Sequence, residues 1–212
     1  MSGLFITALW KDPYFFFCAA FFVIFSICCH EFMHAWVALK EGDPTAADRG
    51  HLTLNPLKQM GWFSLLLFAL FGFAWGQVPV DPDNFRSRFS RVKVALAGPL
   101  TNLLLSFLLV LICVFLLLNE VENPRALEMI FYGSVLNLVL FMLNMIPVPG
   151  FDGFNVVDHF FPGFLRLKSE TSTIVTVVLI LLLFSSVKYL FVFAYFLNGK
   201  VLEMLMKGSQ LW

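Results

Sequence analysis

Long apolar runs separated by short polar stretches are the dominant pattern of this sequence. Four runs, at about residues 14–39, 94–118, 129–146 and 173–197, approach or exceed the roughly 20 residues that an α-helix needs to cross a membrane. A fifth run, Gly61–Gly76, would cover only about 24 Å as a helix, which is short of the ~30 Å hydrocarbon thickness. The pattern predicts an all-α polytopic membrane protein with about four to five transmembrane helices.

The region after the first long run is expected to form an insertion rather than a simple crossing. We expect Gly61–Gly76 to be re-entrant or to lie on the membrane surface, because it is short and carries glycine at both ends and at Gly72. The stretch Gly50–Pro56 alternates in polarity and contains β-favouring residues, which is typical of a short strand. The proline-punctuated stretch QVPVDPDNF, residues 77–85, cannot be helical throughout and is expected to present an extended edge.

Composition supports a membrane protein and excludes one class of partner. Hydrophobic residues make up 59% of the chain and charged residues only 13%, whereas soluble domains contain about 25% charged residues. With 14 basic and 14 acidic residues the net charge is zero, so we expect the lipid bilayer, and no nucleic acid, as a partner. The four cysteines lie inside apolar runs and predict no disulfide. We expect one membrane-embedded domain over 1–212, with core motifs in 14–157 and a C-terminal span and tail in 171–212.

The first apolar run contains the sequence HEFMH, with His30, Glu31 and His34. Residues four apart are neighbours on one face of a helix, so the two imidazoles can converge on one Zn²⁺. Glu31, one position further round, is placed to act as a general base toward water at the metal. Ionisable groups inside a spanning helix cost about 2.5–3.5 kcal/mol when unpaired, so their presence needs a reason. The alternative is a hydrogen-bonded polar knot between helices.

A second motif, Asn144 to Gly153, ends the run at 129–146. Catalytic zinc commonly takes a third protein ligand, often a carboxylate, and Asp152 is the best candidate because it follows a span directly. Gly153 allows a tight turn beside it. The alternative is an ordinary loop aspartate that caps the next helix. Asn144 is predicted to steady a substrate carbonyl or an oxyanion, as an amide side chain can.

A third motif, AGPLTN, opens the run at 94–118. Small residues such as Gly98 let helices approach closely in lipid, so helix packing is the simplest interpretation. Asn102 is predicted to hydrogen-bond across that helix interface or to the groups that surround the metal site.

HEFMH, AGPLTN and NMIPVPGFDG, in this order and each on an apolar run, resemble the core of the site-2 protease family of intramembrane zinc proteases. The similarity covers about residues 14–157. The chain resembles the compact members of the family, which have no PDZ or nucleotide-sensing domain. Phe151 stands where the family usually has leucine. The resemblance implies one zinc ion bound by His30, His34 and Asp152, with Glu31 as general base. It also implies cleavage in or near the transmembrane segment of a membrane-protein substrate, as in regulated intramembrane proteolysis.

The three predicted ligands constrain the topology. They can meet at one depth only if the runs at 14–39 and 129–146 cross in the same direction, which requires that Gly61–Gly76 does not cross. An excess of positive charge marks the cytoplasmic side, so we predict a multi-pass protein of the cell (inner) membrane with its active site near the cytoplasmic face. The basic residues expected on that side are Lys40, Arg49, Lys58, Arg86, Arg88, Arg91, Lys93, Arg166 and Lys168, against Lys11 and Arg125 opposite.

Two other functions remain open at this point. A catalytically idle relative would bind membrane helices without needing Glu31, and a metal transporter would spread polar residues along a path through several spans. The other two histidines, His51 and His159, are interpreted as surface or interfacial residues rather than metal ligands.

Overall fold

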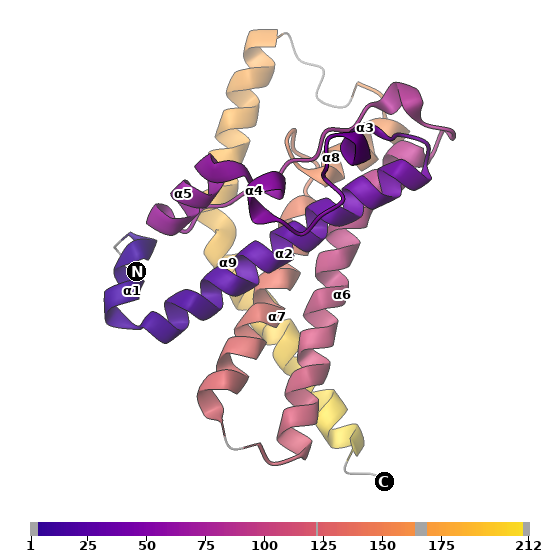
Figure 1. Ribbon diagram of the computed structural model, residues 1–212. Helices are drawn as coiled ribbons and strands as arrows, with labels where there is room; N and C mark the ends of the chain where they lie inside the picture. Colours follow the sequence, from indigo (N-terminus) through magenta and orange to yellow (C-terminus); the bar gives the residue numbers. More distant parts are fainter. Residues whose placement is uncertain (1–3, 122, 164–168, 210–212) are drawn as a thin grey trace.

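The computed structural model describes residues 4–121, 123–163 and 169–209 (Figure 1). Arg166 and Lys168, and residues 210–212 of the predicted tail, lie outside the described residues. The elements are η1 (Phe5–Thr7), α1 (Ala8–Lys11), α2 (Pro13–Lys40), α3 (Thr45–Asp48), α4 (Pro56–Gln59), α5 (Gly61–Phe71), η2 (Pro82–Asn84), α6 (Ser90–Leu118), α7 (Pro124–Asn144), α8 (Asp152–Phe160) and α9 (Ser169–Ser209).

Within the described residues, four helices are long and apolar enough to cross a membrane: α2, α6, α7 and the Ser185–Gly208 part of α9. This confirms the prediction of an all-α, multi-pass membrane protein. Two of these helices, α2 and α7, begin with the same capping arrangement. Asp12 and Asn123 each accept a hydrogen bond from a backbone N–H of the first turn, and each is followed by a proline. A side-chain cap with proline in the first turn satisfies free donors and fixes the start of a helix.

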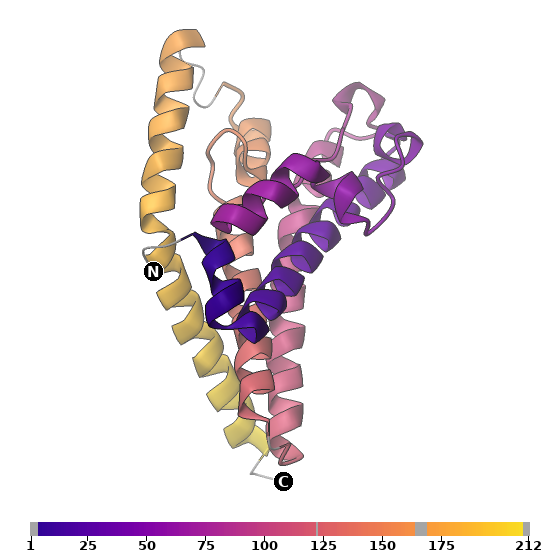
Figure 2. The ribbon, with the colours of Figure 1, turned by 60° about the vertical axis from the view of Figure 1, so that its left-hand side comes forward.

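The directions of the helices agree with the sequence argument. In both views α2 and α7 run toward the end of the molecule that carries α8, whereas α6 and α9 run away from it (Figures 1 and 2). The short helix α5 has 11 residues and ends at Gly72, whose φ of 77° is left-handed. Such a helix is about 16 Å long, so it is too short to cross the hydrocarbon layer.

A buried polar cluster attaches α9 to α6 and α7. The amide nitrogen of Asn198 donates to the hydroxyl oxygens of Ser106, at 3.0 Å, and Ser134, at 3.1 Å. All three side chains are buried. Interhelical hydrogen bonds of this kind contribute about 0.6–2 kcal/mol in a membrane, where small residues also allow close packing. The cluster therefore fixes α9 against the two central helices.

The stretch Gly50–Pro56 does not form the predicted strand, and none of the described residues is in a strand. Two of its carbonyl groups accept hydrogen bonds from a side chain instead of from a neighbouring strand. The amide nitrogen of Gln59, which is fully buried, donates to the carbonyl oxygens of His51 and Thr53 at 2.8 and 2.5 Å. Polar and apolar residues do alternate in this stretch, but no strand among the described residues is available to pair with it. The stretch therefore forms an irregular loop.

Asp43 joins the end of α2 to the segment that precedes α6. Its buried carboxylate accepts hydrogen bonds from the backbone N–H of Thr45 at 3.0 Å and of Asp81 at 2.7 Å, and from the Asn84 amide at 3.1 Å. Burial alone would raise the pKa of Asp43, but these hydrogen bonds outweigh it and hold the pKa below its usual range. The loops on either side of α5 therefore lie at the same end of the molecule.

This arrangement predicts the sidedness of three exposed positions. In a background without the four native cysteines, Lys58→Cys and Asp83→Cys should react with a membrane-impermeant maleimide from one side of the membrane. Glu120→Cys, at the far end of α6, should react only from the other side. Labelling of positions 58 and 83 from opposite sides would show that α5 crosses.

Candidate metal centre

The side chains of His30, His34 and Asp152 converge at one point between α2 and the first residue of α8. The Oδ2 atom of Asp152 lies 3.1 Å from Nε2 of His30 and 3.3 Å from Nε2 of His34. The two Nε2 atoms are 2.9 Å apart. Ligands bound tetrahedrally to one zinc ion at ~2.0–2.1 Å are separated by about 3.3 Å, so the spacing fits a single ion. Within the described ranges this is the one such group of histidine, cysteine and carboxylate side chains.

The remaining ring nitrogens of both histidines face hydrogen-bond acceptors. Nδ1 of His30 lies 2.6 Å from Oδ1 of Asn102, and Nδ1 of His34 lies 2.7 Å from the carbonyl oxygen of Val94. Each Nδ1 therefore carries a hydrogen, which leaves the lone pair of each Nε2 free for a metal. Both acceptors come from α6, so this helix fixes the orientation of the two imidazoles. Asn102 thus makes one of the contacts predicted from its motif.

A second asparagine supports Asn102 from α7. The amide nitrogen of Asn102 lies 3.1 Å from Oδ1 of Asn137, and the amide nitrogen of Asn137 donates to the carbonyl oxygen of Gly133 at 2.9 Å. These amides are buried and connect α2, α6 and α7 through His30. Sequence reasoning missed Asn137. The available signal was a polar amide in the middle of an otherwise apolar span.

Two glycines of the predicted motifs lie where a side chain would not fit. A Cβ atom at Gly98 would come into collision with Nε2 of both His30 and His34, in the space that a shared metal would occupy. A Cβ atom at Gly153 would collide with the carbonyl group of Met145. Close packing of α6 against α2, and of α8 against the loop after α7, thus brings the three ligands together.

The helix that carries Asp152 is also fixed by an ion pair. The guanidinium group of Arg91, at the start of α6, donates to Oδ1 of Asn155 at 2.9 Å and to Oδ2 of Asp158 at 3.2 Å. Asn155 and Asp158 follow Asp152 at intervals of three residues and so lie near the same helix face. From the sequence, Arg91 is predicted only as a charge on the cytoplasmic side, because nothing in its local sequence indicates Asn155 and Asp158 as its partners.

Glu31 lies beside the metal group and beside an extended segment. Its side chain is buried and interacts electrostatically with His30, His34 and Asp152. Gly76 packs directly on it, so closely that a Cβ atom at this position would collide with the Glu31 side chain. Glu31 is therefore covered on one side by backbone rather than by a bulky residue.

The extended segment after α5 is hydrogen-bonded to the rest of the protein through alternate residues. Trp75 exchanges hydrogen bonds with the hydroxyl of Ser64, Gln77 donates its N–H to the carbonyl oxygen of Gln59, and Asp81 donates to Asp43. In extended chain, successive backbone groups point to opposite sides. Pro79, which has no N–H, occupies the same side of the segment as the bonded residues Trp75, Gln77 and Asp81. The N–H groups of Val78 and Val80 make no hydrogen bond in the part of the chain that the structure describes.

The other candidate residues lie outside the metal group. The amide of Asn144 donates to the carbonyl oxygen of Leu140 in its own helix at 3.1 Å, and its predicted role toward an oxyanion stays a prediction. His159 lies on α8 against the ring of Phe89, with centroids 5.4 Å apart. His51 lies near Gln59, with 3.4 Å between its Nδ1 and the amide oxygen. Neither histidine is a member of the ligand set.

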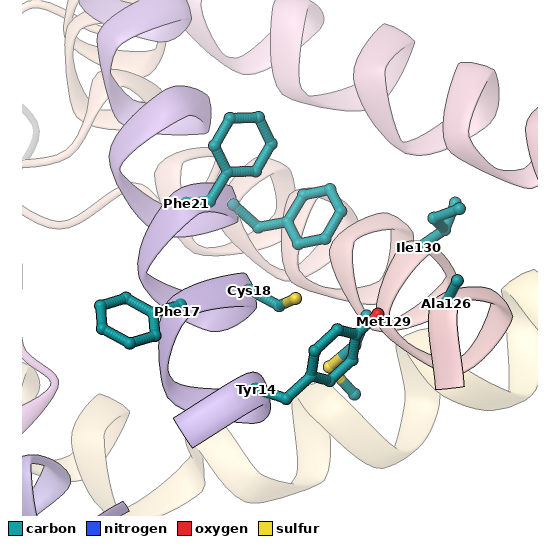
Figure 3. Close-up of a pocket in the computed structure, with 8 residues that line it drawn as sticks. Tyr14, Phe17, Cys18, Phe21, Ala126, Met129 and Ile130 are labelled. Atoms are coloured by element: carbon teal, nitrogen blue, oxygen red, sulfur yellow. The ribbon is translucent and has the colours of Figure 1, made fainter. Parts of the chain in front are cut away.

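An apolar groove lies apart from this centre. It has a volume of about 300 Å³ and lies between α2 and α7, where Tyr14 and Cys18 face Ala126 and Met129 (Figure 3). Its lining contains neither carboxylate nor imidazole, and Cys18 is about 18 Å along α2 from His30. The three metal-binding side chains therefore lie outside this groove.

Comparison with known proteins gives a consistent set of relatives. The model of peptidase family M50 matches residues 17–123, which include the HEFMH motif and Asn102 but end before Asp152. A Bacillus subtilis protein named "Putative zinc metalloprotease YwhC" is 36% identical over 169 residues, which cover 76% of this chain and 77% of the relative. No solved structure matches the chain.

More distant relatives carry the same description. Rip2 of Mycolicibacterium smegmatis is 33% identical over 148 residues, covering 64% of this chain and 54% of that protein. MJ0611 of Methanocaldococcus jannaschii is 34% identical over 130 residues, covering 60% of this chain and 62% of that protein. These two matches span less than two thirds of the relatives concerned.

The position of Gly98 yields a test of the metal site. Gly98→Ala should lower zinc affinity on the order of 10–100-fold, because the methyl group would stand between the two Nε2 atoms. Zinc stoichiometry of the purified protein across buffered free-zinc concentrations measures the effect. Gly199→Ala is the matched control, since a Cβ atom there meets no other atom within 4 Å. Equal zinc binding by Gly98→Ala and wild type would contradict the assigned site.

Proposed function

The chain belongs to peptidase family M50, the site-2 protease family, and from this we propose that it hydrolyses a peptide bond in or near the transmembrane segment of a membrane-protein substrate. It is a membrane metalloprotease whose cofactor is zinc. The observation that carries the proposal is the convergence of Asp152 with His30 and His34. These two histidines and Glu31 lie on α2, a helix long enough to span a membrane.

Each residue of the centre has a distinct role in the proposed reaction. His30, His34 and Asp152 hold the zinc ion, which, when bound, polarises the scissile carbonyl and makes water more acidic. Glu31 takes a proton from the attacking water and delivers it to the leaving amine. Asn102 and the Val94 carbonyl keep both imidazoles in the tautomer that binds metal.

The site lies at a depth suited to a membrane-embedded substrate. Glu31 is nine residues before the end of α2 at Lys40, which is about 14 Å along the helix. The centre is therefore inside the span but nearer to the end where α3 and α8 lie. We propose that this end faces the cytoplasm, in the cell (inner) membrane, because Lys40, Arg91 and Lys93 gather there.

We further propose that an extended part of the substrate pairs with the free edge at Val78 and Val80. The inward-facing groups of this segment are already bonded, whereas the N–H groups of these two valines are not. The segment passes Glu31 at Gly76, so a strand added to this edge would bring its peptide bonds close to the base. Strand addition of this kind gives affinity through main-chain hydrogen bonds. The substrate helix must unwind to make them.

The two alternative functions fit the site less well. An idle relative has no need for a buried carboxylate beside a complete ligand set, and burial of such a group is costly. A transporter requires charged or metal-binding groups along a route. The second buried polar cluster, Asn198 with Ser106 and Ser134, contains amide and hydroxyl groups that bond to one another and no ionisable side chain.

Substitution of the base separates catalysis from metal binding. Glu31→Gln should retain zinc but lower cleavage of a co-reconstituted membrane substrate by about 10²–10⁴-fold, because the proton acceptor is lost while the ligands remain. Asp152→Asn should weaken zinc binding and cleavage together. Metal analysis and a cleavage assay on the same proteoliposomes measure both effects. Undiminished cleavage by Glu31→Gln would exclude the proposed mechanism.

Substitution at the free edge tests substrate pairing. Val80→Pro removes one outward N–H and should reduce cleavage about tenfold or more, with zinc content unchanged. Val80→Ala keeps the N–H and is the matched control, which should cleave within about twofold of wild type. Equal activity of Val80→Pro and Val80→Ala would show that this edge does not bind substrate.

A further inference from the structure

A buried glutamine holds the ring of His51. Gln59 is only 1% exposed, and its amide nitrogen donates to the carbonyl oxygens of His51 and Thr53. Its amide oxygen lies 3.4 Å from Nδ1 of His51. The whole polar end of this side chain is thus used on the loop that carries His51. An amide oxygen accepts, so Nδ1 carries a hydrogen toward Gln59, and Nε2 is not engaged by Gln59.

The same glutamine attaches the loop of His51 to the segment that packs on Glu31. The carbonyl oxygen of Gln59 accepts from Gln77 N–H at 3.0 Å, and Gln77 follows Gly76, which packs on Glu31. Met60, the next residue, packs against Ile27 and Cys28 in the turn of α2 that precedes Glu31. The loop of His51 is therefore attached to the Glu31 side of α2.

Glu31 interacts electrostatically with His51 as well as with the three metal ligands. His51 differs from the ligands in two ways: it comes from the insertion rather than from α2 or α8, and its side chain is partly exposed. A partly exposed imidazole with a fixed Nδ1 beside a buried carboxylate is available to a bound peptide.

We propose that His51 is a further catalytic residue of this protease, which contacts the carbonyl group of the scissile peptide through Nε2 on the Glu31 side of the zinc site. The proposal rests on the proposed proteolytic function. Gln59 would act as the positioning residue that fixes the ring. In the protonated ring Nε2 donates a hydrogen bond, and a donor aimed at the carbonyl oxygen stabilises the negative charge that develops there.

Two substitutions distinguish contact through Nε2 from a purely structural role. The amide of asparagine reaches about as far as Nδ1, so His51→Asn keeps a polar group toward Gln59 but removes Nε2. The amide of glutamine reaches about as far as Nε2. If His51 acts on the substrate, His51→Asn should lower kcat/KM by about 10–100-fold, and His51→Gln should retain most of the activity. Zinc content and Tm should match wild type in both variants.

Three outcomes would overturn the proposal. His51→Asn could cleave like wild type, both variants could lose activity equally, or His51→Gln could be the weaker of the two. The first means that the ring is dispensable, and the second that an amide at the Nε2 position does not restore activity. The third means that the Gln59 side of the ring is what matters. Any of these results assigns His51 to the structure of the loop.

A binding measurement keeps this test separate from the proposed function. A phosphinic peptide carries a tetrahedral, negatively charged group in place of the scissile carbonyl. Its Kd for zinc-loaded Glu31→Gln protein should rise about 10–100-fold when His51→Asn is added, and much less with His51→Gln. If wild type cleaves no substrate but this difference is found, the proteolytic function fails while the contact of His51 stands. An unchanged Kd in both double variants overturns the contact itself.

Discussion

The meeting of His30, His34 and Asp152 at one point is the constraint on which the rest of the structure depends. His30 and Asp152 are 122 positions apart, yet their side chains are 3.1 Å apart. His30 lies near the C-terminal end of α2, and Asp152 follows shortly after the C-terminal end of α7. These two helices must therefore run in the same direction. The chain must then return once through α6, and α5 must not cross. One contact in three dimensions thus determines the order of crossings along most of the chain.

The low polarity of the surroundings explains why so many other residues serve this contact. An unpaired polar group in a membrane interior costs several kcal/mol, so each imidazole needs an acceptor for its second nitrogen. Asn102 supplies one and the Val94 carbonyl the other, and Asn137 in turn satisfies the amide of Asn102. The same helix must approach closely enough to do this, which is possible because position 98 is glycine. Metal binding and helix packing therefore depend on the same residues of α6.

The sequence predicted the parts of this arrangement that depend on local pattern. Apolar length identified the spanning helices, and the four-residue spacing of His30 and His34 placed both on one helix face. It did not predict Gln59, Asn137 or Arg91, because their roles come from hydrogen bonds to partners that are brought near by folding. The strand expected at Gly50–Pro56 was wrong for the same reason. Alternation predicts a strand only where a second strand is available to pair, and here a glutamine side chain takes that place.

The two sides of Glu31 differ in a way that suits a protease. Toward the metal, the second nitrogen of each imidazole is bonded within the protein, which fixes the orientation of both ligands. Toward the insertion, Gly76 brings bare backbone against the carboxyl group, and the chain beyond it is fixed through alternate residues only. Anchoring by Ser64, Gln59 and Asp43 makes this segment stable without using the outward N–H groups of Val78 and Val80. A peptide that enters here meets a preformed edge and loses little binding energy to ordering the protein, so the cost of unwinding the substrate helix can be offset by the hydrogen bonds it gains.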